Sequence, residues 1–307
     1  MDQNLQLLLA KVEGTYGVDS VPAPSTDALL VSGLTIGTPA EVNEREAVSG
    51  SLSPFPPAKP TMGLVEVKFK MEVKGSGAAA TPPEIGLFLR AARVLETVAA
   101  QVDYDPMSAA GPSLSIYAYL DGLVHKVLGC VTTDVEALFE SGKIASWNVT
   151  CKGLYSVPTD AAIPSGAVFD STIPPVVESL AFTIGGYALI ASKLQLNLGL
   201  ASGVRKSVQA AGGVLGAAVT GRKIMGSVDP EAVTRATADF WALMAAATPG
   251  ALTATLGSAA GNRLIITAPA VIYDPFAWGE REGRRIFEIP LRFSRSAGDD
   301  EVRFRFN

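Results

Sequence analysis

The clearest pattern in this chain is an unbroken alternation of apolar and charged residues over residues 64–74. The apolar positions are Val65, Val67, Phe69, Met71 and Val73, and the charged positions are Glu66, Lys68, Lys70, Glu72 and Lys74. A period of two predicts a β-strand with one face in the core and the other in solvent. The solvent face of this strand therefore carries a row of charges of both signs.

Weaker patterns predict that the rest of the first half is also β, with one helix. The helix is expected at residues 83–99, with Pro83 in its first turn and Thr81 as its cap. Asp121 and Gly122 separate two apolar runs and predict a hairpin turn. Strands are expected at residues 27–36, 113–123 and 143–155.

The second half repeats this order of elements more faintly. A helix is expected at residues 230–247, with Asp229 as its cap and Pro230 at the first helical position. Strands are expected at residues 179–190, 193–200, 222–228, 251–257, 263–273 and 285–294. The repeated order predicts a mainly β (β+α) chain of two tandem β-sandwich or barrel-like domains, each with one flanking α-helix.

Length and proline content suggest where the chain divides. Its 307 residues are enough for two domains of roughly 150 residues each. Residues 157–175 hold four prolines and no helical or strand period, which is typical of a linker. The expected organisation is an N-terminal arm at 1–26, with a short apolar helix candidate at residues 5–12, a first domain at 27–157, a proline-rich linker at 158–175 and a second domain at 176–307.

Two long segments contain no predicted element. Residues 38–62 hold five prolines, and residues 201–221, rich in glycine and alanine, take the equivalent place in the second half. Long structureless loops inside a compact domain are usually functional or ordered by a partner. The apolar part of the second segment, residues 207–221, is too short and too rich in glycine to cross a bilayer, and we expect no membrane-spanning segment.

Composition argues against a protein that grips nucleic acid, and it fits an assembling protein and a large core rich in alanine and glycine equally well. Apolar residues make up 48% of the chain and charged residues only 18%, and a chain so poor in charge often hides surface in an assembly. The net charge of −5 argues against tight nucleic-acid binding, which normally needs a basic excess. Cys130 and Cys151 are too few for a disulfide framework, and we expect Cys151 to be a buried free thiol on the face that carries Trp147 and Val149.

The residues that most enzymes need are missing. His125 is the only histidine, which excludes metal sites built on histidine pairs, and no GxSxG motif accompanies it. The nearest match to a phosphate-binding loop has Arg222 where lysine is needed and Lys223 where a hydroxyl is needed. We therefore expect no enzymatic activity, no cofactor and no metal.

Arginines and phenylalanines alternate at the C-terminal end of the chain. Arg303 and Arg305 share one face of EVRFRF, and Phe304 and Phe306 share the other. Aromatic side chains interleaved with arginines can stack on the bases of single-stranded nucleic acid. A terminal β-strand also explains the alternation, and we favour the strand. The nearby acids Asp299, Asp300 and Glu301 are the expected counter-charges.

Several segments together resemble the tail tube (major tail) proteins of long-tailed, non-contractile bacteriophages. KVEGTYGVDSVPAPSTDALLVSGLTI is similar to their N-terminal stretch, TPPEIGLFLRA to the opening of their single helix, and the segment from SLSIYAYLDG to KGLY to their closing strands. The resemblance covers residues 8–156 best; GALTATLGSAAGNRLIITAPAVIYD and RRIFEIPLRFSR extend it into the second half. It implies a small β-sandwich or barrel-like domain with one helix. Six such domains would form a ring, and rings would stack into a channel for the genome.

The resemblance also implies surfaces and partners. Because the chain is long enough for two tube-like domains, a trimeric ring with pseudo-sixfold symmetry is favoured over a hexamer whose second domain decorates the outside. The expected channel lining is Glu66, Lys68, Lys70, Glu72 and Lys74. The expected ring-stacking residues are Glu41, Glu44, Arg45, Glu46, Phe55, Lys59, Arg205 and Lys206. Implied partners are tail tip or initiator, tape measure and tail terminator proteins, with DNA passing through without tight binding, in a virion assembled in the host cytoplasm.

Two other functions remain open at this point. The chain could be another tail protein, such as a terminator or a minor tail protein. It could also be a monomeric β-sandwich module that binds a ligand such as carbohydrate, which would require an exposed aromatic platform. Trp147, Trp241 and Trp278 are scattered in the sequence and do not predict one.

Overall fold

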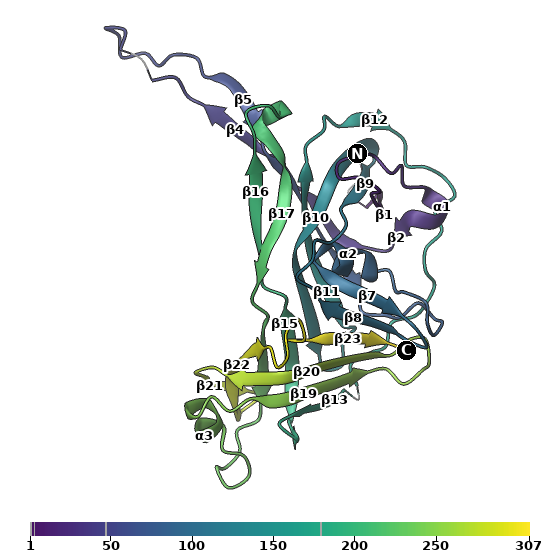
Figure 1. Ribbon diagram of the computed structural model, residues 1–307, viewed down its shortest axis with the longest axis vertical. Coiled ribbons are helices and arrows are strands. Elements are labelled where there is room, and N and C mark those ends of the chain that lie inside the picture. Colours follow the sequence, from purple (N-terminus) through teal and green to yellow (C-terminus); the bar gives the residue numbers. More distant parts are fainter. Residues whose placement is uncertain (1, 3, 47, 179) are drawn as a thin grey trace.

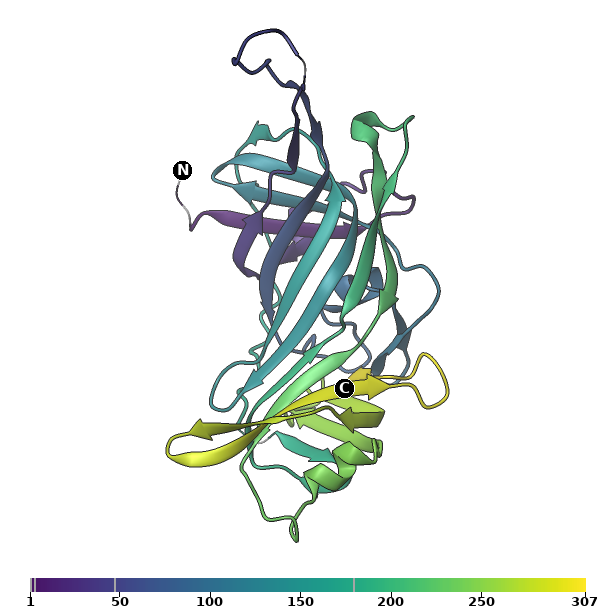
Figure 2. The ribbon, with the colours of Figure 1, turned by 90° about the vertical axis from the view of Figure 1, so that its left-hand side faces the viewer.

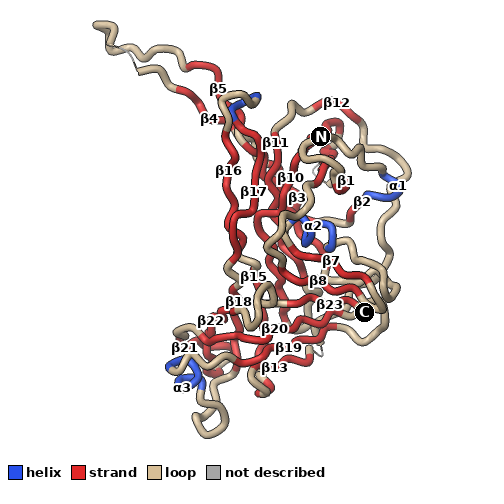
Figure 3. Tube along the Cα trace, in the orientation of Figure 1, coloured by secondary structure: helices blue, strands red, loops and turns tan. Residues whose placement is uncertain are grey.

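The fold consists almost entirely of antiparallel strands. The computed structural model describes residues 2, 4–46, 48–178 and 180–307. Figures 1 and 3 show an elongated body of strands, with few and short helices and with hairpins extending from one end. The prediction of a mainly β chain is confirmed.

The elements fall in this order along the first half: β1 (Gln6–Val12), α1 (Pro24–Asp27), β2 (Ala28–Leu29), β3 (Ser32–Ile36), β4 (Ala40–Asn43), β5 (Ala58–Met62), β6 (Leu64–Glu72), α2 (Gly86–Ala91), β7 (Val94–Val98), β8 (Val102–Pro106), β9 (Leu114–Leu120), β10 (Gly122–Glu140), β11 (Ser146–Leu154) and β12 (Thr159–Ala161). The second half contains β13 (Ala181–Ile184), β14 (Tyr187–Ala188), β15 (Ala191–Asn197), β16 (Leu200–Lys206), β17 (Val214–Arg222), β18 (Met225–Pro230), α3 (Phe240–Ala245), β19 (Gly250–Leu256), β20 (Leu264–Tyr273), β21 (Ala277–Arg281), β22 (Arg284–Ser294) and β23 (Arg303–Phe306).

The N-terminal segment is a strand, and the helix expected at residues 5–12 is wrong. β1 pairs with β9 along its whole length, from Gln6 opposite Leu120 to Val12 opposite Leu114. Its apolar run is buried on both faces, since Leu8 packs in the main core and Leu9 in a second, smaller cluster. A strand covered on both sides shows no alternation, and therefore its sequence can be mistaken for that of a short helix.

The long strand β10 connects the two halves of the chain. Its beginning pairs with β9 across the Asp121–Gly122 turn, which confirms the predicted hairpin, and its middle pairs with β11. Its end pairs with β15, the first long strand of the second half. A second seam joins β23 to β8, so strands of the two halves pair with each other at two places.

One apolar core runs through both halves. Phe69, Trp147, Phe287 and Phe304 all belong to the same buried cluster. The Trp147 and Phe304 rings meet edge to face, with centroids 5.4 Å apart, although they come from β11 and β23. The division into two tandem domains joined by a linker stays a prediction.

Both predicted helices are much shorter than expected. α2 covers only Gly86–Ala91 and is followed directly by β7, so the expected helix at 83–99 is mostly wrong. α3 covers Phe240–Ala245, and Asp229 and Pro230, expected to open a helix, lie at the end of β18. The observed cap is Asp239, whose side chain accepts a hydrogen bond of 3.0 Å from the backbone N–H of Ala242.

The two segments expected to be loops are β-hairpins. β4 pairs with β5, and β16 pairs with β17. Both hairpins extend toward the same end of the molecule (upper part of Figures 1 and 2). Proline and glycine interrupt the alternation in these segments, which is why no strand was predicted there.

The C-terminal strand confirms the predicted alternation but not the predicted counter-charges. Phe304 and Phe306 are buried, while Arg303 and Arg305 form paired hydrogen bonds of 2.7–3.0 Å with Asp105 and Asp103 of β8. The bond from Arg305 lowers the pKa of Asp103.

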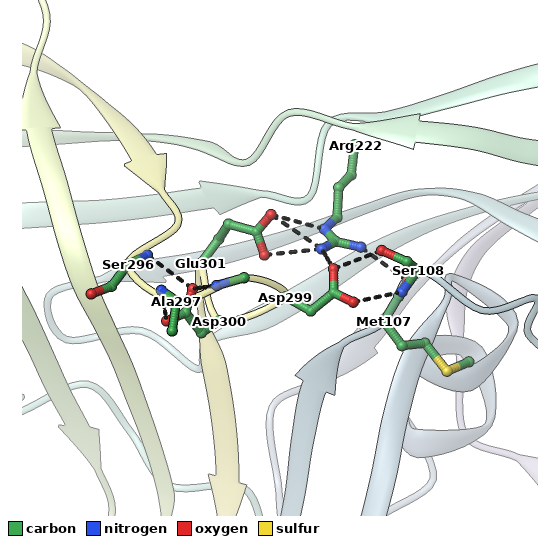
Figure 4. A network of polar contacts seen from close by, with 9 residues as sticks. Met107, Ser108, Arg222, Ser296, Ala297, Asp299, Asp300 and Glu301 are labelled. Atoms are coloured by element: carbon green, nitrogen blue, oxygen red, sulfur yellow. Dashed lines mark hydrogen bonds and ion pairs between the residues drawn. The ribbon is translucent and has the colours of Figure 1, made fainter.

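The acids expected beside the C-terminal arginines bind a different cation. Asp299 and Glu301 contact Arg222 at the end of β17, and Arg222 also donates a 3.0 Å bond to the carbonyl of Met107 (Figure 4). Ser108 donates to Asp299 from its hydroxyl at 2.8 Å. This network fixes the base of the β16–β17 hairpin against the segments that follow β8 and precede β23.

Candidate assembly surfaces

The first candidate surface is the outer face of the sheet that contains β6. The predicted alternation is confirmed: Val67 and Phe69 are 0% and 2% exposed, while Lys68 and Lys70 point to solvent. Glu66 and Glu72 on the same face are half-buried. The residue pattern of β6 therefore makes one dry face and one polar face.

The neighbouring strands continue this polar face. Lys70 of β6 lies opposite Asn148 of β11, which lies opposite Glu136 of β10, which lies opposite Asn197 of β15. Figure 2 shows these strands side by side as one surface that passes from the first half of the chain into the second. We call this surface the polar sheet face. Its other outward polar members include Asp134, Glu140, Thr150, Lys152, Lys193 and Gln195, and the apolar Leu138 lies among them, opposite Gln195.

Side chains on the polar sheet face pair with one another. The Glu66 carboxylate lies 2.6 Å from the ammonium group of Lys68 and 3.4 Å from that of Lys152. The hydrogen bond from Lys68 lowers the pKa of Glu66. Glu136 accepts a 2.7 Å bond from Asn148 and a second bond from Gln195. Acids and bases are thus interleaved, so that no large patch of one sign attracts or repels a polyanion strongly.

The expectation that Lys74 lies on this face is wrong. It lies beyond the end of β6, where its side chain is only 6% exposed. Its ammonium group lies 3.4 Å from the carboxylate of Asp170 and donates a 2.9 Å bond to the carbonyl of that residue. Lys74 therefore anchors the proline-rich segment that was expected to be a linker.

The second candidate surface is the β4–β5 hairpin with its proline-rich tip. Glu41, Glu44, Arg45 and Glu46 are exposed, and the Arg45 guanidinium lies 5.6 Å from the ring centroid of Phe55. Apolar side chains are exposed as well, most of all Leu52 at 107%. An exposed apolar tip on a projecting hairpin is typical of a segment that binds a partner.

The β16–β17 hairpin stands beside the first one. Arg205 and Lys206 are exposed on β16, and the tip residues Gly212 and Gly213 line one pocket together with Lys59 of β5. The structure therefore brings the two sets of expected ring-stacking residues to the same end of the molecule. Their role in stacking stays a prediction.

Comparison with known protein families shows which family the chain belongs to. A family model described as phage tail tube protein matches residues 3–296. The chain belongs to the phage tail tube protein family. No curated protein matches it. The resemblance inferred from the sequence is thereby confirmed, and with it a structural role in the phage tail that implies self-assembly and contact with other tail proteins.

Sequence reasoning found only one strand of the polar sheet face of this tail tube protein. It missed Asp134, Glu136, Asn148, Lys152 and Lys193, although β11 and the end of β10 also alternate between buried and half-buried residues. That alternation was a usable signal. The order of the strands in the sheet could not be predicted from the sequence, because cross-strand neighbours such as Glu136 and Asn197 are far apart in it.

The part of the chain that the structure describes contains no group of three or more His, Cys, Asp or Glu side chains placed to hold a metal ion. His125 is half-buried on β10, and burial lowers its pKa. Cys130 and Cys151 are free and buried, as predicted for Cys151. None of the helices in the described residues is long and apolar enough to cross a membrane.

Exchanging Lys68 and Lys70 for glutamate in this tail tube protein is expected to leave the fold intact. Both side chains are exposed on β6, so the expected change in stability is within about 1 kcal/mol. Thermal unfolding of the double variant measures this change. The contrasting control is Phe69→Ala, which removes the buried side chain between the two lysines and leaves a cavity in the core. A large fall in melting temperature for the double variant would mean that the two lysines are not on a solvent face.

Proposed function

We propose that this protein polymerises into stacked rings that form the tail tube, with the polar sheet face lining the channel through which the genome passes. The observation that carries the proposal is the continuity of this face across the β10–β15 pairing. Each chain would thereby contribute a wide section of wall. The interleaved charges suit a channel that lets DNA slide without holding it.

The favoured ring is a trimer in which each chain supplies two sections of the wall, giving pseudo-sixfold symmetry. A hexamer with the second half of each chain on the outside is the alternative. Within the described residues β3 pairs only with β6, so it leaves an open edge on the sheet. Open edges normally invite aggregation, and in a closed ring they would pair with the edges of neighbouring copies.

The proposal extends to partners and place. Rings would stack through the two hairpins, beginning on a tail tip or initiator protein, around a tape measure protein, and ending at a terminator. Assembly would take place in the host cytoplasm before the tail joins the virion. No catalytic step, cofactor or metal enters this function.

Shortening the β4–β5 hairpin is expected to abolish polymerisation without unfolding the protein. Because Asn43 lies opposite Ala58, residues 44–57 can be replaced by a two-residue Asn-Gly turn that keeps the β4–β5 pairing. Negative-stain electron microscopy and mass photometry of wild type and variant measure the outcome. Hollow tubes from the shortened protein at the wild-type yield would refute a role for the hairpin in stacking.

A further inference from the structure

Two tryptophans that are distant in the sequence meet on the surface. Trp241 of α3 and Trp278 of β21 have ring centroids 6.0 Å apart, so the tryptophans are not all scattered, contrary to the expectation from the sequence. Phe276 lies 5.6 Å from Trp241, and Phe287 forms the floor, 4.7 Å from Trp278. We call Trp241, Phe276 and Trp278 the aromatic surface.

Trp278 is the exposed member of the aromatic surface, whereas Trp241 and Phe276 are half-buried against the core. Trp278 is 57% exposed, and the Arg285 guanidinium lies 5.8 Å from its ring centroid. Arg235 is 71% exposed, although it already contacts Asp239. Exposed tryptophan beside arginine is the composition typical of the centre of a protein interface.

This surface lies apart from the proposed channel. Trp278 pairs with Phe287, whose side chain is buried, so Trp278 stands on the core side of the β21–β22 ribbon. Glu288, the next residue of β22, points to the opposite side, where it is exposed. α3 and β21 lie at the far end of the long axis from the β4–β5 hairpin (Figure 1). A head-to-tail arrangement of two copies would therefore bring the hairpin of one toward the aromatic surface of the other.

The chemistry of the hairpin tip fits such a site. Residues 53–57 read SPFPP and are all exposed. Ser53, Phe55 and Pro56 each precede a proline, which restricts the backbone to extended conformations and lowers the entropy lost on binding. Proline-rich segments bind in grooves lined by aromatic side chains.

Charge complementarity supports the same pairing. The hairpin strand before the tip carries Glu41, Glu44 and Glu46 against a single cation, Arg45. The exposed cations on the side of the aromatic surface are Arg235 and Arg285, and Glu280 lies opposite Arg285. The acids of the hairpin would thus lie near Arg235 and Arg285 while the prolines lie on the indoles.

We propose that residues 53–57 of one copy bind the aromatic surface of a second copy, as a heterologous contact between successive subunits. This inference rests on the proposed polymerisation and names the receiving side of the hairpin contact. The hairpin and its receptor belong to opposite ends of the chain, so the contact can propagate from copy to copy.

Disulfide cross-linking between copies tests the contact directly. The native cysteines are both 0% exposed, so a thiol introduced on the surface is the accessible one. Ser53→Cys places a thiol in the tip, and Glu280→Cys places one on an exposed position of the strand face that carries Trp278. The two single variants are mixed under a mild oxidant, and covalent heterodimers are quantified on a non-reducing gel. The matched control pairs Ser53→Cys with Phe169→Cys, an exposed aromatic position between β12 and β13.

The proposal predicts at least tenfold more heterodimer from the 53–280 pair than from the 53–169 pair. Trp278→Ala is expected to raise the protein concentration needed for assembly on the order of tenfold, and Phe169→Ala to leave it unchanged. Equal cross-linking in both pairs overturns the proposal, even if wild type forms normal tubes. Specific cross-linking without any tubes supports the contact and counts against stacked rings, so the two ideas fail separately.

Discussion

Replacing Glu13 by alanine is expected to destabilise the protein by roughly 3–5 kcal/mol, the range seen when a buried charged group is removed from its partners. Glu13 is only 6% exposed. Its carboxylate accepts bonds from the Gly17 and Gly129 backbone N–H groups at 2.7 and 2.8 Å, and from the Ser113 and Ser115 hydroxyls at 2.6 and 3.0 Å. Alanine would leave all four donors without this acceptor.

The position of Gly129 explains why this one carboxylate matters for the whole fold. Gly129 lies at the bulge where β10 leaves its pairing with β9 and takes up its pairing with β11. Its φ of 58° is in the region that favours glycine. Glu13 therefore connects the end of β1 to the turning point of the strand that joins the two halves.

Urea unfolding at neutral pH measures the effect of Glu13→Ala. Glu41→Ala is the matched control, because that carboxylate is exposed on the hairpin and its loss should change stability by no more than about 0.5 kcal/mol. Glu13→Gln should lie between the two, since its amide keeps one acceptor oxygen but brings a donor toward donors. A loss under about 1 kcal/mol for Glu13→Ala would contradict this account of the site.

Trp147→Ala is the second large expected effect, at roughly 3–5 kcal/mol. Trp147 is 0% exposed and packs edge to face against Phe304 of β23. Because one ring comes from the first half of the chain and the other from the second, the cavity would weaken both halves together. We expect one cooperative unfolding transition at a lower temperature, with no separate transition for either half.

Calorimetry of Trp147→Ala measures how much stability is lost and whether the protein still unfolds in a single transition. Trp278→Ala removes the same side chain from a position that is 57% exposed, and should cost much less. Trp147→Phe is informative as well, since the indole N–H of Trp147 finds no hydrogen-bond partner within the described residues. Two resolved transitions in the variant would contradict a core shared by the two halves.

The fold was predictable from the sequence where one face of a strand is dry and the other wet. β6 and β11 alternate plainly, and both were expected near their observed positions. β1 was mistaken for a helix because both of its faces are buried. The second predicted helix was too long because Asp229 and Pro230, normal signals of a helix start, instead end β18.

The polar sheet face was predictable only one strand at a time. The charged row on β6 could be predicted, but Lys74 was wrongly included in it. The strand ends at Glu72, and Lys74, two residues further on, turns inward to Asp170. Contacts such as Arg305 with Asp103 join residues about two hundred positions apart, and no local pattern indicates them. Local charges such as Asp300 were therefore assigned to the wrong partners.

The central claim is that the polar sheet face of many copies forms the wall of a channel. Electron cryomicroscopy of the assembled tube tests it most directly. The account predicts a continuous β wall around a hollow lumen, with Lys68, Lys70, Asn148 and Glu136 facing inward and with β10 and β15 of each chain side by side in that wall. A tube whose lumen is lined by other strands, with β6 on its outer surface, would contradict it.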